Sequence, residues 1–208
     1  MKTTADRIFE YLDYRDGFYI ECGANDGVTQ SNTYKLETDK NWKGILIEPS
    51  EIKINQCKNN RNDKNIFLNC ALVSDDYHNE FIEGDFNYSD NGQSLMASIN
   101  GERRENASNL INVRAKTLAS ILDEFKIKKI DLFSLDVEGY ELNVLNGLDL
   151  NRHKPINILI EIYNKDFYNI VNLMLKYNYK LIANISDFNL QNNPAWDGTH
   201  NDYLFTKI

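Results

Sequence analysis

The chain has 208 residues, of which 42% are hydrophobic and 26% charged, a composition that is typical of one folded domain and argues against global disorder. The net charge is −8 and no long run of Lys and Arg occurs, which weighs against a nucleic-acid partner. The N-terminus lacks a signal-peptide core and no apolar run approaches about 18 residues, so we expect a cytoplasmic protein without a membrane span.

Seven apolar runs are expected to form strands, and the segments between them have helical patterns. Several runs are nearly continuous in Ile, Leu and Phe, which is typical of parallel strands covered on both faces. The runs are Phe18–Cys22, Gly44–Glu48, Asn65–Ala71, Ile130–Val137, Ile156–Ile162, Tyr179–Ala183 and Tyr203–Ile208. The alternation of strands and helices predicts a parallel α/β sandwich.

Helical spacing is clear in four segments. Near the N-terminus, Ile8, Tyr11 and Leu12 share one face of a short helix. Thr117 is a suitable N-cap for a second helix, and Gly147 a suitable C-cap for a third. A fourth apolar stripe occupies residues 167–175. We interpret the stripes of the last three segments as faces that pack on the sheet.

One segment departs from this alternation. Residues Ser74–Val113 are rich in Asp, Asn, Ser and Gly and contain no long core stripe. Long connections without regular structure are usually functional loops or disordered. We therefore expect a single domain, 1–208, with an insertion at about 74–113 that serves as a lid or a substrate platform. The alternative is a solvated surface elaboration.

The segment Phe18–Gly27, FYIECGANDG, predicts a buried strand, a glycine turn and then a polar segment that opens a helix from Thr29 onward. Ligands of open α/β sheets bind at such junctions. The loop and its flanks carry Glu21 and Asp26 but no Lys or Arg. A pyrophosphate is therefore disfavoured, whereas the sulfonium and ammonium groups of S-adenosylmethionine suit these carboxylates.

Glu48 ends the second predicted strand, about 20 residues after the glycine turn, where a carboxylate grips a ribose diol in dinucleotide-type folds. A nicotinamide-dependent oxidoreductase is the alternative within enzymes. Its fingerprint G-x-G-x-x-G is not met, because Asn25 replaces the middle glycine in GANDG. The sequence also contains no P-loop.

A second motif, SLDVEGYE, places Asp136 at the end of the fourth predicted strand and Glu138 in the following turn. Glu161 ends the fifth strand and is expected to face the same crevice. These three carboxylates can hold the ammonium of a cofactor, bind Mg²⁺ or Ca²⁺ through oxygen ligands, or deprotonate an acceptor. His200, which leads into the last strand, is a further candidate for a base or a metal ligand.

Four segments together resemble the FkbM family of S-adenosylmethionine-dependent methyltransferases in order and spacing. They are GANDGVTQSNTYKLE (Gly23–Glu37), NWKGILIEPS (Asn41–Ser50), NCALVSD (Asn69–Asp75) and IDLFSLDVEGYELNVLNGL (Ile130–Leu148). The resemblance implies a class I methyltransferase fold, a Rossmann-like three-layer sandwich. Its sheet has seven mostly parallel strands and an antiparallel last strand.

The resemblance also implies which residues bind the cofactor. The glycine loop would cradle the methionine part, Glu48 would hold the ribose, and Ala71 and Leu72 would lie by the adenine. The implied set is Glu21, Gly23, Ala24, Asn25, Asp26, Gly27, Ser31, Glu48, Pro49, Ala71, Leu72 and Asp136.

Because family members commonly O-methylate sugars, the resemblance implies a sugar hydroxyl of a glycan or glycoconjugate precursor as acceptor, within a glycan-biosynthesis assembly. The catalytic candidates are Asp136, Glu138, Glu161 and His200. Asp136 is the first choice for the base. The alternative outside enzymes is an inactive methyltransferase-like module that binds a glycan or a partner protein.

Overall fold

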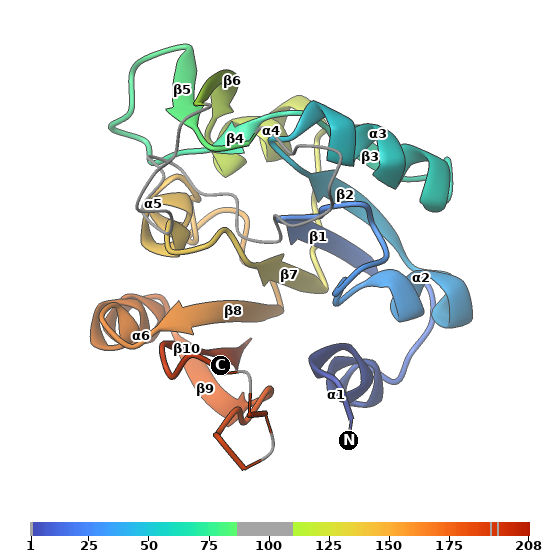
Figure 1. Ribbon diagram of the computed structural model, residues 1–208, viewed down its shortest axis with the longest axis vertical. Coiled ribbons are helices and arrows are strands. Elements are labelled where there is room, and N and C mark those ends of the chain that lie inside the picture. The colour runs from blue at the N-terminus through green and yellow to red at the C-terminus, as the bar shows by residue number, and fades with distance from the viewer. Residues whose placement is uncertain (1, 87–109, 192, 195) are drawn as a thin grey trace.

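A seven-stranded sheet forms the centre of the molecule (Figure 1). The computed structural model describes residues 2–86, 110–191, 193–194 and 196–208. The strands of the sheet, in spatial order, are β3 (Ile66–Leu68), β2 (Lys43–Ile47), β1 (Phe18–Cys22), β7 (Leu132–Leu135), β8 (Asn157–Tyr163), β10 (His200–Lys207) and β9 (Tyr179–Asn184). Neighbours are parallel except at β10, which runs antiparallel to β8 and β9. The predicted mostly parallel sheet with an antiparallel last strand is confirmed.

Helices cover both faces of this sheet, because successive side chains of its strands point to opposite sides. Ile20 of β1 belongs to the core under one set of helices, whereas its neighbour Tyr19 belongs to the core under the other set. The first set comprises α4 (Leu118–Glu124), α5 (Glu141–Asn146) and α6 (Phe167–Lys176), and the second comprises α1 (Thr4–Tyr11), α2 (Tyr34–Lys40) and α3 (Glu51–Asn60). The result is the predicted three-layer sandwich.

The helix signals in the sequence are largely confirmed. The Thr117 side chain caps α4 by accepting a hydrogen bond from the Ser120 amide, and Gly147 is the C-cap of α5. The short helix expected near the N-terminus is α1. Of the three apolar residues on its predicted face, Ile8 and Leu12 are buried, whereas Tyr11 is 53% exposed.

The predicted third strand, Asn65–Ala71, is divided in the structure. After β3 the Asn69 side-chain amide donates to the carbonyls of Glu48 and Pro49, at 3.0 and 2.8 Å, and the chain leaves the main sheet. A second sheet follows. Its strands are β4 (Ala71–Leu72), β6 (Ile111–Lys116) and β5 (Phe81–Gly84).

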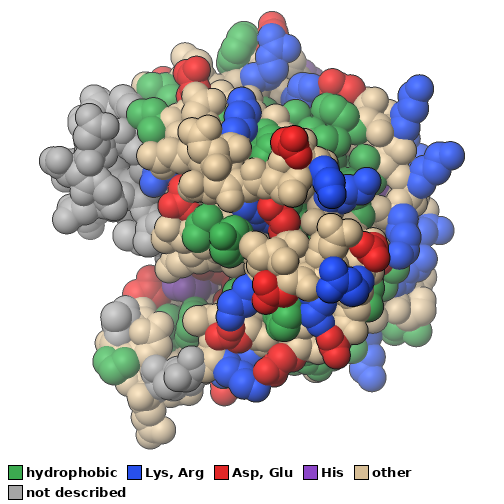
Figure 2. All heavy atoms as spheres, turned by 90° about the vertical axis from the view of Figure 1, so that its right-hand side faces the viewer, with side chains coloured by type: hydrophobic (Ala, Val, Ile, Leu, Met, Phe, Trp, Pro, Cys, Tyr) green, Lys and Arg blue, Asp and Glu red, His purple; other side chains and the backbone are tan. Residues whose placement is uncertain are grey.

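The predicted insertion at 74–113 thus contains β5 and the beginning of β6, which pack on their own small core. Residues 87–109 lie outside the described part of the chain, and the prediction of a lid or platform there stays a prediction. Among the described helices, none combines the length and the apolar character needed to cross a membrane. Figure 2 shows the side of the molecule hollowed at the left, with acidic and histidine side chains inside the hollow.

Candidate functional site

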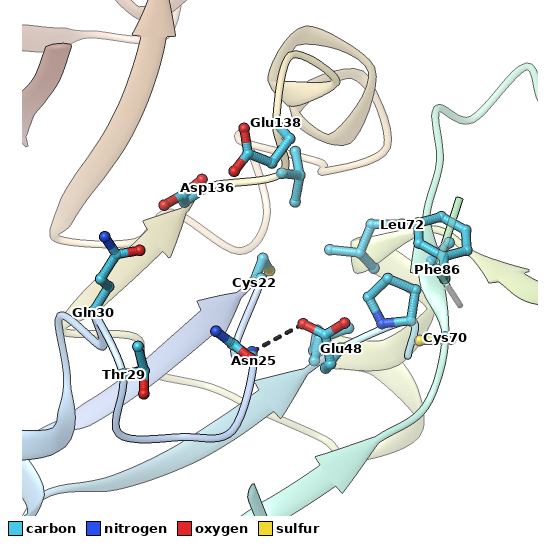
Figure 3. Close-up of a pocket in the computed structure, with 15 residues that line it drawn as sticks. Cys22, Asn25, Thr29, Gln30, Glu48, Cys70, Leu72, Phe86, Asp136 and Glu138 are labelled. Carbon is cyan, nitrogen blue, oxygen red and sulfur yellow. Dashed lines mark hydrogen bonds between the residues drawn. The ribbon is translucent and has the colours of Figure 1, made fainter. Parts of the chain in front are cut away.

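A cleft opens at the carboxyl ends of β1, β2 and β7 (Figure 3). Its walls come from the glycine loop after β1, the residues that follow β2 and β7, and the second sheet. The lining residues are Cys22, Gly23, Asn25, Thr29, Gln30, Ile47, Glu48, Pro49, Cys70, Ala71, Leu72, Phe86, Asp136, Val137 and Glu138. This edge of a parallel sheet is where α/β folds bind ligands.

Gly23 brings the glycine loop against the end of β7. Its φ is +78°, and a Cβ atom at this position would lie 1.9 Å from the Asp136 carbonyl oxygen. The amides of Gly23 and Ala24 both donate to the Ile47 carbonyl at 3.1 Å. The loop backbone is therefore held between β2 and β7, and only glycine fits at its first position.

Most amide groups of the glycine loop donate hydrogen bonds within the protein. The Asn25 amide donates to Glu48 at 2.9 Å and the Gly27 amide to the Ala24 carbonyl at 2.8 Å. The amides of Val28 and Thr29 donate to the Asp26 carboxylate at 2.9 and 2.7 Å. A pyrophosphate is bound by free amides at a helix N-terminus. The loop therefore lacks the donors that a dinucleotide would use at these positions.

Asp26 organises this loop from outside the cleft. Burial alone would raise its pKa, but the hydrogen bonds from Thr29 and Val28 outweigh burial, and the pKa lies below its ordinary value. We predicted a cofactor contact for this residue. In the structure the Asp26 carboxylate instead stabilises the backbone turn that follows it, with the hydrogen bonds of an Asx-type turn.

Glu48 is buried at the floor of the cleft, with 4% of its surface exposed. One carboxylate oxygen accepts from the Asn25 amide and the other from the Ser50 amide, each at 2.9 Å. Burial raises the pKa of Glu48 to about 7 despite these hydrogen bonds. Each oxygen retains a second lone pair, and Figure 3 shows the carboxylate beside Asn25 at the cleft.

The hydrogen-bond acceptors at the cleft suit a ligand that is rich in donors. Asn25, in a left-handed conformation with φ +49°, buries its side-chain oxygen, which has no hydrogen-bond partner among the described residues. Asp136 and Glu138 face it across the cleft, and Leu72 and Phe86 form an apolar wall (Figure 3). An ammonium, a ribose diol and an adenine ring match these three surfaces, so the residues present fit S-adenosylmethionine.

Glu21 does not line the cleft, and its predicted contact with a cofactor is not supported by its position. It is 4% exposed, and its carboxylate accepts from the hydroxyls of Ser31 and Thr33 at 2.9 and 2.6 Å and from the Asn32 amide at 2.8 Å. Residues 31–33 are thus bonded to Glu21 and do not form the first turn of the predicted helix. The helix α2 begins at Tyr34 instead of near Thr29.

Arg61, at the end of α3, is the positive partner of Glu21 that local sequence inspection missed. Its side chain is fully buried and lies 3.4 Å from Glu21 and 2.8 Å from Glu37. The residue is 40 positions away from Glu21, and a pattern within the loop gives no signal for it. The loop is therefore not a purely anionic environment.

The turn after β7 carries Glu138 in a left-handed conformation, with φ +58°, followed by Gly139 with φ +96°. Glu141 holds this turn, since its buried carboxylate accepts from the amides of Val137 and Gly139 at 3.1 and 3.0 Å. Burial raises the pKa of Glu141 to about 7. Glycine adopts a positive φ readily, but the left-handed conformation of Glu138 is strained, and such strain is concentrated at functional sites.

Glu161 and His200 lie beside the cleft, on β8 and β10. The His200 Nε2 atom is 3.3 Å from Glu161 Oε1, and 17% of the histidine side chain is exposed. The Tyr163 hydroxyl donates to Glu138 at 3.0 Å and so connects β8 to the turn after β7. Burial, and after it the charges of Asp136 and Glu138, raise the pKa of Glu161 well above its usual range.

A divalent cation, one of the three uses considered for these carboxylates, finds no support. In the part of the chain that the structure describes, no group of three or more His, Cys, Asp or Glu side chains has the arrangement of a metal site. The predicted residues thus divide into two groups. Those at the cleft are Gly23, Asn25, Glu48, Pro49, Ala71, Leu72, Asp136 and Glu138. Those outside its lining are Glu21, Ala24, Asp26, Gly27, Ser31, Glu161 and His200.

Comparisons with known proteins agree with this geometry. A family model described as the methyltransferase FkbM domain matches residues 21–181. The crystal structure of the methyltransferase FkbM from Methylobacillus flagellatus KT superposes with a TM-score of 0.63 at 16% identity, over 98% of this chain and 48% of that chain. The chain thus spans about half the length of that protein.

Two further structures share the fold. M. capricolum TrmK, solved with S-adenosyl-homocysteine, has a TM-score of 0.53 at 10% identity, over 100% of this chain and 69% of that chain. The TehB-like SAM-dependent methyltransferase from Corynebacterium glutamicum ATCC 13032 Kitasato has a TM-score of 0.50 at 9% identity, over 100% of this chain and 89% of that chain. No curated protein sequence matches the chain. At these identities the likeness is one of fold, the class I methyltransferase fold.

Proposed function

The chain belongs to the FkbM family of S-adenosylmethionine-dependent methyltransferases, and from this we propose that it transfers a methyl group to a hydroxyl of a sugar. The observation that carries the proposal is the cleft at β1, β2 and β7. There the Asn25 side-chain oxygen, which has no partner within the described part of the chain, and the buried Glu48 carboxylate can accept hydrogen bonds from a donor-rich ligand. The acceptor is proposed to be a glycan or glycoconjugate precursor, handled within a glycan-biosynthesis assembly.

Different residues of the cleft are proposed to bind different parts of the cofactor. Glu48 accepts the ribose hydroxyls through its remaining lone pairs, and Leu72 and Phe86 pack against the adenine. Asn25 and Asp136 accept from the methionine ammonium. A cation is stabilised beside carboxylates in a partly buried site, because the effective dielectric constant there is lower than that of water.

Bound S-adenosylmethionine supplies an activated methyl group, so the protein's own task is to align the acceptor and remove its hydroxyl proton. Asp136 is the proposed base. It lies at the cleft end of β7, and its carboxylate takes the proton of the hydroxyl. Glu138 borders the same space, and Glu161 with His200 extends the polar surface over β8 and β10, where these side chains orient the acceptor.

Binding and transfer assays test this function. Calorimetry should show that S-adenosylhomocysteine binds whereas NAD and ATP do not. Labelled S-adenosylmethionine should then transfer its methyl group to members of a panel of methyl glycosides and nucleotide sugars. Tight NAD binding would favour the oxidoreductase, and cofactor binding without transfer to any hydroxyl would favour the inactive module. Transfer to amines alone would contradict the proposed acceptor.

Cofactor affinity is expected to depend on pH through Glu48. Its pKa of about 7 means that the carboxyl is mostly protonated at pH 6, whereas ribose hydroxyls donate to the charged form. Binding therefore releases a proton, and affinity rises with pH up to about 7. We expect S-adenosylhomocysteine to bind about tenfold more weakly at pH 6 than at pH 8.

Calorimetry in two buffers of different ionisation enthalpy measures both the affinity and the released proton. Glu48→Gln is the control. This variant should bind about 10–100-fold more weakly at pH 8, because it loses hydrogen bonds to a charged group. Its affinity should also be flat between pH 6 and 8. A Glu48→Gln variant that keeps the pH dependence of the unaltered protein would show that another group is responsible.

A further inference from the structure

Arg61 contacts the glycine loop at Gly27 but is not among the residues that line the cleft. It is the C-cap residue of α3, and its side chain is completely buried. Its guanidinium donates to six oxygen atoms, of which five belong to side chains and one is a backbone carbonyl. The acceptors are the Gly27 carbonyl at 2.8 Å, Ser31 Oγ at 3.1 Å, Glu21 at 3.4 Å, the Tyr19 hydroxyl at 2.7 Å, Thr33 Oγ1 at 2.9 Å and Glu37 at 2.8 Å.

The Nη1 atom of Arg61 holds the loop at two points, Gly27 and Ser31. Gly27 has φ +83°, and a Cβ atom there would lie 2.8 Å from Arg61 Cγ, so the loop backbone rests directly on the arginine stem. Between the two points lie Thr29 and Gln30, which line the cleft. Gln30 is itself in a left-handed conformation, with φ +59°.

The Nε atom of Arg61 contacts a residue outside the glycine loop. It donates to Glu37 of α2, which also accepts from the Tyr19 hydroxyl at 2.6 Å and from the Asn62 amide at 2.7 Å. Glu37 has no hydrogen bond with residues 23–31 among the described contacts. Two acidic partners thus share one buried cation, but only one of them, Glu21, belongs to the segment that shapes the cleft.

We infer that Arg61 is a positioning residue of the cofactor site, which fixes the Gly27–Ser31 turn so that Thr29 and Gln30 present the cleft surface to the cofactor. The inference rests on the proposed cofactor. It assigns cofactor affinity to a side chain that is excluded from the cleft and touches no reacting atom. A planar guanidinium is required, because a lysine ammonium cannot reach Gly27, Ser31 and Glu37 from one position.

Arg61→Lys and Glu37→Gln form a matched pair for the test. Each variant disrupts the buried Arg61–Glu37 contact, and each should lose stability in urea unfolding. Only Arg61→Lys also releases Gly27 and Ser31. We expect Arg61→Lys to bind S-adenosylhomocysteine about tenfold or more weakly than the unaltered protein. Glu37→Gln should bind it within about twofold of the unaltered protein, as expected where no contact with the turn is lost.

Hydrogen exchange of the Val28–Ser31 amides provides a readout that does not depend on the cofactor. Exchange there should be faster in Arg61→Lys than in Glu37→Gln. If the two variants show equal affinity and equal exchange, Arg61 has only a general structural role and the inference is overturned. Failure of the unaltered protein to bind S-adenosylhomocysteine would instead overturn the proposed cofactor.

Should Arg61→Lys fail to fold, Ser31→Ala replaces it. This change removes the hydroxyl that accepts from Arg61 at 3.1 Å and donates to Glu21, and it leaves the buried charges in place. The turn should again exchange faster and the affinity for S-adenosylhomocysteine should fall. Unchanged affinity and exchange in Ser31→Ala would contradict the role assigned to the Arg61 contacts.

Discussion

Asp136→Asn is expected to abolish most turnover and to leave the fold intact. Most of the affinity for S-adenosylhomocysteine should remain, because the asparagine oxygen still accepts a hydrogen bond from the methionine ammonium. The backbone of Asp136 is fixed by its amide, which donates to the Cys22 carbonyl at 3.2 Å, and this contact does not depend on the side chain. The amide of asparagine has nearly the shape of the carboxylate but cannot take a proton. Loss of a general base typically lowers the rate by about 10²–10⁴-fold.

Steady-state transfer of a labelled methyl group, together with calorimetry, measures both effects. Asp131→Asn at the opposite end of β7 is a suitable control. Asp131 is buried and accepts from the Phe18 amide at 2.9 Å and the Tyr14 hydroxyl at 3.0 Å, far from the cleft lining. This control should lose stability but keep its turnover. Normal methylation by Asp136→Asn would remove it as the base, and Glu161→Gln and His200→Gln would then identify the group that serves.

Most of the sheet could be predicted from the sequence, because a buried parallel strand is an uninterrupted apolar run. Phe18–Cys22 was predicted with its observed bounds, and the β8 run was displaced by a single residue. The run Asn65–Ala71 was misjudged because the polar side chain of Asn69 ends β3 by bonding to neighbouring carbonyls. A hydropathy pattern carries no information about such a bond.

The candidate site could be predicted in its position but not in the role of each carboxylate. Strand ends identify which edge of the sheet binds ligand, and Glu48 and Asp136 are at the cleft as predicted. Glu21 has the same local pattern, yet it is paired with Arg61 on a helix 40 residues later. Whether an acid faces a ligand or a buried cation depends on tertiary contacts, which local motifs do not encode.

Gly23→Ala is expected to destroy the cofactor site, and Gly198→Ala offers a control with a similar backbone conformation. Gly23 has φ +78° and Gly198 φ +82°, so alanine is strained at both positions by about 1–2 kcal/mol. At Gly198 no atom of the described residues, apart from its own chain neighbours, lies within 4 Å of the added Cβ. At Gly23 the Cβ would lie 1.9 Å from the Asp136 carbonyl oxygen, and the backbone at the ends of β1 and β7 must separate.

This separation would move Asn25, which lies in the glycine loop, away from the proposed base Asp136 at the end of β7. Methyl transfer requires both residues in their places at the cleft. Overpacking adds about 1–3 kcal/mol to the loss in the free energy of unfolding, and a misplacement of about 1 Å at a reacting centre can cost about 10²-fold. Urea unfolding and calorimetry should therefore show that Gly198→Ala loses only the conformational strain and binds S-adenosylhomocysteine normally. Gly23→Ala should lose more stability and nearly all binding, and equal binding by the two variants would mean that the close approach of loop and strand is dispensable.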